Sequence, residues 1–319
     1  MEPPLPPFHP KLPALLEHLK LRIVDAVKWN VLLCVAVDDE KNHPTHVLKF
    51  GIDPRKNESL AYETRIMREA FPAIDDTAFE TLVLPEFLGG KEHDGMRWLL
   101  MKYIEGHPLV REWSELTFKD DILGGKGIDD KIATMAVDVL RDLRMIDTTR
   151  LPDFIRGFDF VQWLDSFKVR SGEMVEAGLL EKSAIEVALK IFTSHRPERY
   201  QGSVFTNGDF YPRNFIITAD NKVALVDWVG GIDPWDFVAM YAWLLMWNNT
   251  KWQVRYVTDL KKHFRIDGDE MQVGLLVKSF DMVYRWKDQP EVDIGFARTQ
   301  MLAYFHHCLD LDYVRQLFG

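Results

Sequence analysis

Three side chains that can bind a metal ion or accept a proton stand close together in the second half of the chain. Asp209 and Asn214 have a spacing at which a short loop can direct a carboxylate at a substrate hydroxyl and return an amide oxygen to a metal. Asp227 follows the apolar run 223–226, so its carboxylate is expected at the end of a strand. Magnesium prefers such oxygen ligands, and phosphoryl transfer from ATP needs a carboxylate near the acceptor hydroxyl. These residue types at this spacing therefore fit phosphoryl transfer.

A predicted β-hairpin brings two of these residues together. The apolar runs Phe215–Thr218 and 223–226 are typical of strands, and the polar residues 219–222 between them suit a turn. Because the first strand follows Asn214 and the second ends before Asp227, the two side chains are expected side by side. A carboxylate and an amide at the same end of a hairpin favour a magnesium site.

The first third of the chain is expected to be mainly β-structure. Its strand-like runs are Leu21–Val27, Val31–Val37, His46–Gly51, Thr81–Leu84 and Arg97–Tyr103. The first three follow one another closely, which predicts an antiparallel meander whose third strand carries Lys49. Asn57–Phe71 has apolar side chains at helical spacing, so a helix carrying Glu63 is expected there.

Almost everything after Ile104-Glu105-Gly106 is typical of helices. Asp130–Asp147 has a sustained apolar face. Asp267 and Glu270 have the spacing of a capping box before another helix. The remaining helices are expected at Phe160–Val175, Lys182–Ser194, Trp235–Trp247, Lys251–His263, Met271–Trp286 and Ile294–Leu317. The order of mainly β and then mainly α segments indicates an α+β fold with a division at residue 104.

The combined pattern resembles the aminoglycoside phosphotransferase and choline kinase group, over roughly residues 20–250. The resemblance rests on Asn207-Gly208-Asp209 with Asn214, on Val226-Asp227-Trp228, on 232–237, on the linker-like stretch 97–106 and on 140–152. It implies a two-lobed, protein-kinase-like α+β fold, with a small, mainly antiparallel N-terminal lobe and a larger helical C-terminal lobe. Residues 1–104 would form the nucleotide-binding lobe. Residues 105–319 would carry the catalytic loop and the substrate site.

The resemblance also implies roles for particular residues. Asp209 would be the catalytic base, or would orient the acceptor hydroxyl, and Asn214 and Asp227 would hold Mg2+. ATP would be bound by Lys49 at the α- and β-phosphates, by Glu63 acting through Lys49, by the Lys102 carbonyl and Ile104 amide at the adenine, by Asn30 in the phosphate loop, and by Arg213. Asp236 would bond the backbone of the catalytic loop. The implied activity is ATP- and Mg2+-dependent phosphorylation of a hydroxyl group on a small molecule.

The chain departs from the family pattern at three places. Asn207 and Arg144 stand where the family usually has histidine. The first glycine of the chain is Gly51, so the turn Lys28-Trp29-Asn30 between the first two strands contains none. An asparagine can still donate and accept hydrogen bonds, but a glycine-free loop approaches phosphate less easily. The alternative hypothesis is therefore a kinase-like protein that binds a nucleotide or metabolite without turnover.

A protein-substrate kinase is a weaker alternative, because the chain between Asp227 and Asp236 is too short for a long regulatory loop. The Trp235, Trp243 and Trp247 side chains, at helical spacing, fit a core or a cleft wall. His306 and His307 are adjacent on an expected helix, so they would not face one metal.

Composition bounds the remaining classes of function. The 39 basic and 49 acidic residues give a net charge of −10, which argues against nucleic acid as a partner and slightly favours an amine-bearing substrate. Cys34 and Cys308 form neither a disulfide framework nor a zinc pattern. No apolar run is long enough to span a membrane, and the proline-rich start lacks the features of a signal peptide. A cytoplasmic monomer or homodimer, without membrane or nucleic-acid partners, is expected.

Overall fold

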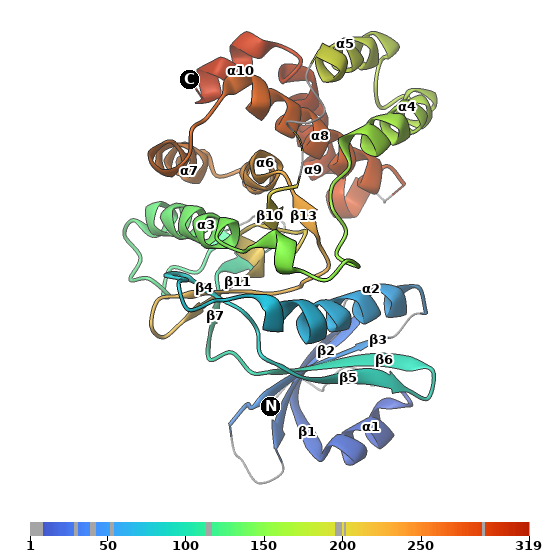
Figure 1. Ribbon diagram of the computed structural model, residues 1–319, viewed down its shortest axis with the longest axis vertical. Coiled ribbons are helices and arrows are strands. Elements are labelled where there is room, and N and C mark those ends of the chain that lie inside the picture. The colour runs from blue at the N-terminus through green and yellow to red at the C-terminus, as the bar shows by residue number, and fades with distance from the viewer. Residues whose placement is uncertain are drawn as a thin grey trace.

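The computed structural model describes residues 9–28, 31–38, 43–51, 54–112, 117–194, 200, 202–288 and 291–318. It confirms the α+β prediction: an antiparallel sheet dominates the N-terminal part and helices dominate the C-terminal part (Figure 1). Trp29 and Asn30 of the predicted turn, and with them the predicted Asn30 phosphate contact, lie outside the described residues.

The first sheet has five antiparallel strands in the order β1-β2-β3-β6-β5. These are β1 (Leu21–Lys28), β2 (Val31–Asp38), β3 (His46–Gly51), β5 (Phe87–His93) and β6 (Met96–Lys102). The first three form the predicted meander. Strand β5 was not predicted, because Gly89-Gly90 and the charged residues that follow interrupt any alternating apolar pattern.

Two helices cover the two faces of this sheet (Figure 1). Helix α1 (Leu12–Leu19) packs on the face that carries Leu48 and Leu100, whereas α2 (Pro54–Arg65) packs on the face of Leu99 and Met101. This division follows from the alternation of side chains along a strand. The predicted helix 57–71 is longer than α2, since the chain continues in a π-helical turn, Ile66–Ala70, and a short 3-10 turn, Phe71–Ala73.

A second sheet joins distant parts of the chain in the order β4-β12-β11-β7. Its strands are β4 (Leu82–Val83), β7 (Gly106–Pro108), β11 (Phe215–Thr218) and β12 (Val223–Leu225). β11 and β12 are the predicted hairpin. The predicted strand Thr81–Leu84 is β4, but it pairs in parallel with β12 and not with the first sheet. Strand β7 was not predicted, because helical patterns dominate the residues after 104. The division at residue 104 stays a prediction.

The placement of β4 has a cause in helix α3 (Ile128–Arg144). The fully buried Asp142 carboxylate accepts the backbone N–H groups of Thr81 and Leu82, each at 2.7 Å. The Thr81 carbonyl in turn accepts the N–H of Val223 at 2.8 Å. Two backbone N–H groups of β4 thus share one buried acceptor on α3, and this contact directs β4 to the second sheet.

Two short strand pairs and seven further helices complete the described chain. The pairs are β8 (Val110–Glu112) with β9 (Thr117–Phe118), and β10 (Val204–Phe205) with β13 (Ile232–Asp233). The helices are α4 (Phe160–Glu176), α5 (Lys182–Ser194), α6 (Trp235–Leu245), α7 (Thr250–His263), α8 (Gly268–Trp286), α9 (Glu291–His307) and α10 (Leu311–Phe318). The prediction of a single helix at 294–317 was wrong, because the two helices α9 and α10 occupy this range. The helical structure is interrupted before Asp310, whose carboxylate accepts the Asp312 N–H at 2.9 Å at the start of α10.

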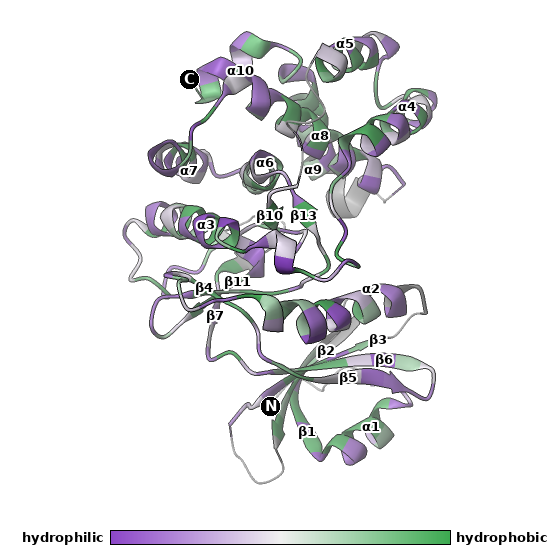
Figure 2. Ribbon diagram, in the orientation of Figure 1, coloured by the Kyte–Doolittle hydropathy of each residue, from purple (hydrophilic) through white to green (hydrophobic). Residues whose placement is uncertain are grey.

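Helix α6 lies at the centre of the main hydrophobic core. Every α6 residue after Trp235 is buried, and α6 packs against α8. Figure 2 shows that hydrophobic residues are frequent along α8 and the strands of the first sheet. A helix that is apolar nearly all round must be enclosed by others, so α6 provides a rigid support for the loop described next.

Candidate active site

The loop between β10 and β11 holds Asp209 and Asn214 in contact. The Asn214 side-chain amide donates to the Asp209 carbonyl at 2.7 Å and to Asp209 Oδ2 at 2.9 Å. A 3-10 turn, Pro212–Asn214, closes the loop and sets this distance. The Asn214 Oδ1 atom has no hydrogen-bond partner within the described ranges, which leaves an oxygen available to a cation.

Asn207 braces this loop, as its hydrogen-bonding capacity predicted. Its amide donates to the carbonyls of Val226, at 2.9 Å, and Asp209, at 3.3 Å. Its Oδ1 accepts the Asp209 N–H at 3.3 Å. The fully buried Asn207 thus ties the loop that carries Asp209 to the chain just before Asp227.

Gly208 lets two backbone segments of the site approach closely. Its φ is +80°, and a Cβ added there would lie 2.6 Å from the Cα of Gly230. The segment that follows Asp227 therefore packs directly against the loop that carries Asp209. Such a contact requires glycine for both conformational and steric reasons.

Gly208→Ala should lower the free energy of unfolding by about 3 kcal/mol or more, because left-handed strain adds to a backbone clash. Gly95→Ala is a matched control, since Gly95 also has a positive φ, +76°, but has nothing within 4 Å of the added Cβ. The control should lose only about 1 kcal/mol. Urea unfolding of the two variants measures the difference, and equal losses would contradict this packing.

Lys49 lies between two carboxylates. Its Nζ is 2.6 Å from Glu63 Oε1 and 2.8 Å from Asp227 Oδ1. Burial opposes the charge on Lys49, but the two carboxylates outweigh it and raise the pKa of the ammonium group above its usual value. The Lys49 charge in turn holds the pKa of Asp227 below its usual value. The predicted Lys49–Glu63 pair is confirmed, whereas the direct contact of Lys49 with Asp227 was not predicted.

The hairpin places Asn214 next to Asp227, as predicted. Phe215 pairs with Leu225, and the Val226 N–H donates to the Asn214 carbonyl at 3.0 Å. The Asp227 side chain is 51% exposed, and its Oδ2 has no hydrogen-bond partner within the described ranges. Two oxygen donors, one of them on a half-exposed side chain, fit Mg2+, which completes its coordination with water and phosphate oxygens.

Within the described segments, no three His, Cys, Asp or Glu side chains gather into a group that could hold a metal ion. The proposed site would consist instead of one carboxylate, one amide and the nucleotide. Magnesium is commonly held in this way, with one or two protein ligands plus phosphates.

Helix α2 is held by the segment 153–158, which the sequence did not single out. The Arg65 guanidinium lies 3.7 Å from the centroid of the Phe154 ring, and the Arg156 N–H donates to the Tyr62 hydroxyl at 3.3 Å. The Arg156 carbonyl accepts the Ile232 N–H at 2.8 Å.

Trp228 also donates its backbone N–H to Glu63 at 3.2 Å. These contacts fix the helix that carries Glu63 to the part of the chain that follows Asp227.

The two residues predicted to contact adenine, Lys102 and Ile104, lie at and just after the end of β6. The Lys102 N–H donates to the Glu86 carbonyl at 3.0 Å, and its side chain pairs with Glu86 at 2.8 Å. The Ile104 N–H has no hydrogen-bond partner among the residues that the structure describes. It is therefore available to a ligand, as a nucleotide-binding linker requires.

Arg213 and Tyr241 complete the surroundings of Asp209. After Lys49, the Arg213 charge also contributes to the lowered pKa of Asp227, so Arg213 belongs to the electrostatics of the site. The Tyr241 hydroxyl donates to Asp209 Oδ1. Sequence reasoning missed Tyr241, because the apolar residues around it in α6 give no sign that one of them reaches the loop.

Among the described residues, Asp236 forms no hydrogen bond to the loop that carries Asp209, so that prediction was wrong. Its carboxyl group lies in the first turn of α6, and its buried Oδ2 has no hydrogen-bond partner in the part of the chain that the structure describes. The side chain is 4% exposed, and burial raises its pKa to about 7. Asp236 is the acidic residue of the first turn of α6, where the helix dipole favours a negative charge.

Asp236→Asn should change how stability depends on pH. The folded-state pKa is raised, so the wild-type chain loses stability as pH rises from about 4 to about 7. The variant does not, and its advantage over wild type should grow by on the order of 4 kcal/mol across that range. Asp147→Asn is the control. Hydrogen bonds from Thr149 lower the pKa of Asp147, so its contribution to stability is fully present above about pH 4, and this variant should run parallel to wild type from about pH 4 to about pH 7. Chemical unfolding at several pH values tests this, and parallel profiles for both variants would contradict it.

The tryptophan, histidine and cysteine residues singled out in the sequence are buried or packed against other side chains. Trp243 is buried, and Trp235 stacks on Phe264 with Arg144 5.6 Å from its ring centroid. The His307 ring contacts Tyr313. Both cysteines are buried free thiols.

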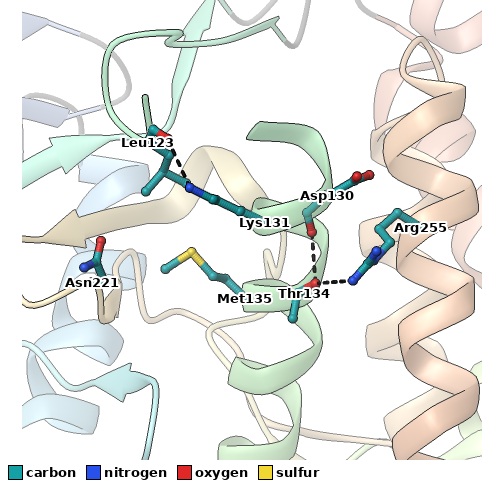
Figure 3. Close-up of a pocket in the computed structure, with 7 residues that line it drawn as sticks. All are labelled: Leu123, Asp130, Lys131, Thr134, Met135, Asn221 and Arg255. Atoms are coloured by element: carbon teal, nitrogen blue, oxygen red, sulfur yellow. Dashed lines mark hydrogen bonds between the residues drawn. The ribbon is translucent and has the colours of Figure 1, made fainter. Parts of the chain in front are cut away.

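A surface pocket of about 430 Å3 lies away from the site, beside α3 and α7. Figure 3 shows that its charged groups do not converge. Lys131 reaches the Leu123 carbonyl on one side of α3, whereas Arg255 points to Thr134 on the other. None of the predicted site residues lines it.

The comparisons with known proteins agree with this architecture. The model of the phosphotransferase enzyme family matches residues 35–272. No curated protein sequence matches the chain significantly. No helix among the described residues is long and apolar enough to cross a membrane.

Several solved structures share the fold at low sequence identity. ADP-bound aminoglycoside phosphotransferase APH(2'')-Ib has a TM-score of 0.61 at 14% identity, over 93% of this chain and 98% of that one. A thermostable mutant of APH(4)-Ia, in complex with ADP and hygromycin B, has a TM-score of 0.62 at 14% identity, over 92% and 97%. Macrolide 2'-phosphotransferase MphH from Brachybacterium faecium has a TM-score of 0.58 at 12% identity, over 91% and 97%.

Proposed function

The chain belongs to the phosphotransferase enzyme family, and from this premise we propose that it transfers the γ-phosphoryl group of ATP to a hydroxyl group of a small molecule. The observation that carries the proposal is the meeting of Asp209, Asn214 and Asp227 at the end of one hairpin, with Lys49 bonded to Asp227. This set supplies a carboxylate for the acceptor, two oxygen ligands and one phosphate-binding cation.

Asp209 receives the acceptor hydroxyl. The acceptor oxygen forms a bond to the γ-phosphorus, the bond from that phosphorus to the bridging oxygen breaks, and ADP leaves with those electrons. The acceptor proton passes to the Asp209 carboxylate, either late in the transfer or after it. Positioning and charge stabilisation provide most of the rate in such reactions, so a carboxylate that orients the hydroxyl is sufficient.

Lys49 and the pair Asn214 and Asp227 act on the phosphates. Bound Mg2+ would neutralise charge that develops on the phosphate oxygens. Lys49 is held by Glu63, so it stays in place when the nucleotide competes for its contact with Asp227. Ile104 offers its N–H, and Lys102 its carbonyl, to the adenine.

An amine-bearing acceptor is the finer proposal. The chain has a net charge of −10, and structures that share its fold are named as aminoglycoside phosphotransferases. A panel of paired alcohols, each with and without an amino group, tests this. The amine-bearing member of each pair should have the higher kcat/KM. A systematic preference for the other member would contradict it.

The activity itself is tested by magnesium-dependent ADP release across a panel of aminoglycosides, macrolides, amino alcohols and sugars. At least one acceptor should stimulate release well above the rate without acceptor. Calorimetry of ATP binding, with and without magnesium, separates this function from the alternative. Tight magnesium-dependent binding with no stimulated release across the panel would favour a binding protein without turnover.

A further inference from the structure

We propose that Tyr241 of helix α6 is a positioning residue, which holds the Asp209 carboxylate in the orientation that receives the acceptor hydroxyl. The proposal rests on the phosphotransferase function. It assigns a role in that reaction to a residue outside the loop and the hairpin.

The Asp209 carboxylate is held at both oxygens by donors from different elements. Asn214 donates to Oδ2 from within the loop, at 2.9 Å, and Tyr241 donates to Oδ1 from α6. With one donor only, the carboxyl group could rotate about its bond to Cβ. Two donors on opposite oxygens fix its plane. Because each carboxylate oxygen has two lone pairs, one hydrogen bond to each leaves room for the acceptor hydroxyl.

The surroundings of Tyr241 keep its hydroxyl in place. The side chain is 9% exposed and sits in the helix that is buried nearly all round. Its ring meets Tyr211 of the catalytic loop edge to face, with centroids 6.4 Å apart. The Lys278 ammonium group, paired with Asp233 at 3.1 Å, lies 5.9 Å from the ring centroid. The ring therefore has little freedom to turn its hydroxyl away from Asp209.

The hydroxyl of Tyr241 remains a donor at working pH. Burial, followed by the Asp209 charge, raises the pKa of Tyr241 well above its usual value, against the opposing charge of Arg285. A protonated phenol can only donate to the carboxylate, so the contact has one direction. Misplacing a catalytic group slightly can cost a large factor in rate, which makes this contact relevant to turnover.

Tyr241→Phe tests the proposal, because it removes one oxygen atom and keeps the ring. Its kcat should fall about 10- to 100-fold, with the KM for ATP and the KM for the acceptor within about twofold of wild type. Tyr256→Phe is the matched control. Tyr256 is a fully buried tyrosine of α7 whose hydroxyl has no hydrogen-bond partner among the described residues, and its variant should keep kcat within about twofold.

A second measurement does not need turnover. Thermal unfolding midpoints of Tyr241→Phe, Asp209→Asn and the double variant form a cycle, and non-additive shifts are expected because the two groups share a bond. Additive shifts would overturn the contact. A kcat for Tyr241→Phe equal to that of Tyr256→Phe, or a loss that appears only in KM, would overturn the positioning role. A wild-type chain that transfers phosphate to no acceptor would instead overturn the proposed function, whatever the cycle shows.

Discussion

Asp209→Asn should lower kcat by about 1,000-fold, the range expected when a positioned carboxylate that handles the acceptor proton is lost. Asparagine has nearly the same shape, so the loop contacts of residue 209 through its backbone should persist. The KM for ATP should change little, since the Asp209 side chain faces Asn214 and Tyr241 and not Lys49. Steady-state ADP release with the best acceptor provides the measurement.

Asp220→Asn is the control for this variant. Asp220 lies in the turn of the same hairpin, is exposed, and bonds Thr218. Its replacement should leave kcat near wild type, and circular dichroism should show both variants folded. A folded Asp209→Asn protein that keeps more than about one tenth of wild-type kcat would show that Asp209 is not the acceptor-side carboxylate.

Asp227→Asn is expected to have the second-largest effect. It removes the negative charge of one proposed magnesium ligand and weakens the contact with Lys49. The kcat/KM for ATP should fall at least about 100-fold, because a fixed charge that stabilises the transferring group is lost. The magnesium concentration at half-maximal rate should rise, which a titration at saturating ATP measures.

Glu63→Gln distinguishes an effect on metal binding from an effect on the position of Lys49. Glu63 also pairs with Lys49, but its side chain is 3% exposed, whereas that of Asp227 is half exposed. This variant should therefore weaken ATP binding without shifting the magnesium dependence. If Asp227→Asn leaves the magnesium dependence unchanged, or if both variants shift it equally, Asp227 does not bind the metal.

The local parts of the site could be predicted from the sequence. Asn214 and Asp227 flank a hairpin, so their proximity follows from two short strands and a turn. The pairing of Lys49 with Glu63 could be predicted because it requires only one strand and the helix that follows it. In each case short-range pattern and side-chain chemistry point to the same arrangement.

The features that were not predicted, or were predicted wrongly, depend on contacts between distant segments. Strand β4 joins the second sheet because buried Asp142 bonds its backbone, and the segment 153–158 reaches both α2 and β13. Asp236 was expected to bond the loop, but its carboxyl group stays at the start of its own helix. Tyr241 looks like a core residue in sequence, and only the packing of α6 against the loop shows its bond to Asp209. Such long-range contacts produce no periodic pattern in the sequence.

Phosphoryl transfer to a hydroxyl acceptor, with Asp209 at the reacting oxygen, is tested most directly by mass spectrometry of the acceptor after incubation with ATP and magnesium. We expect a phosphate ester on one hydroxyl of an acceptor with the wild-type chain, and a strongly reduced yield with Asp209→Asn under the same conditions. ATP consumption without any phosphorylated acceptor, or equal ester yields from both proteins, would contradict it.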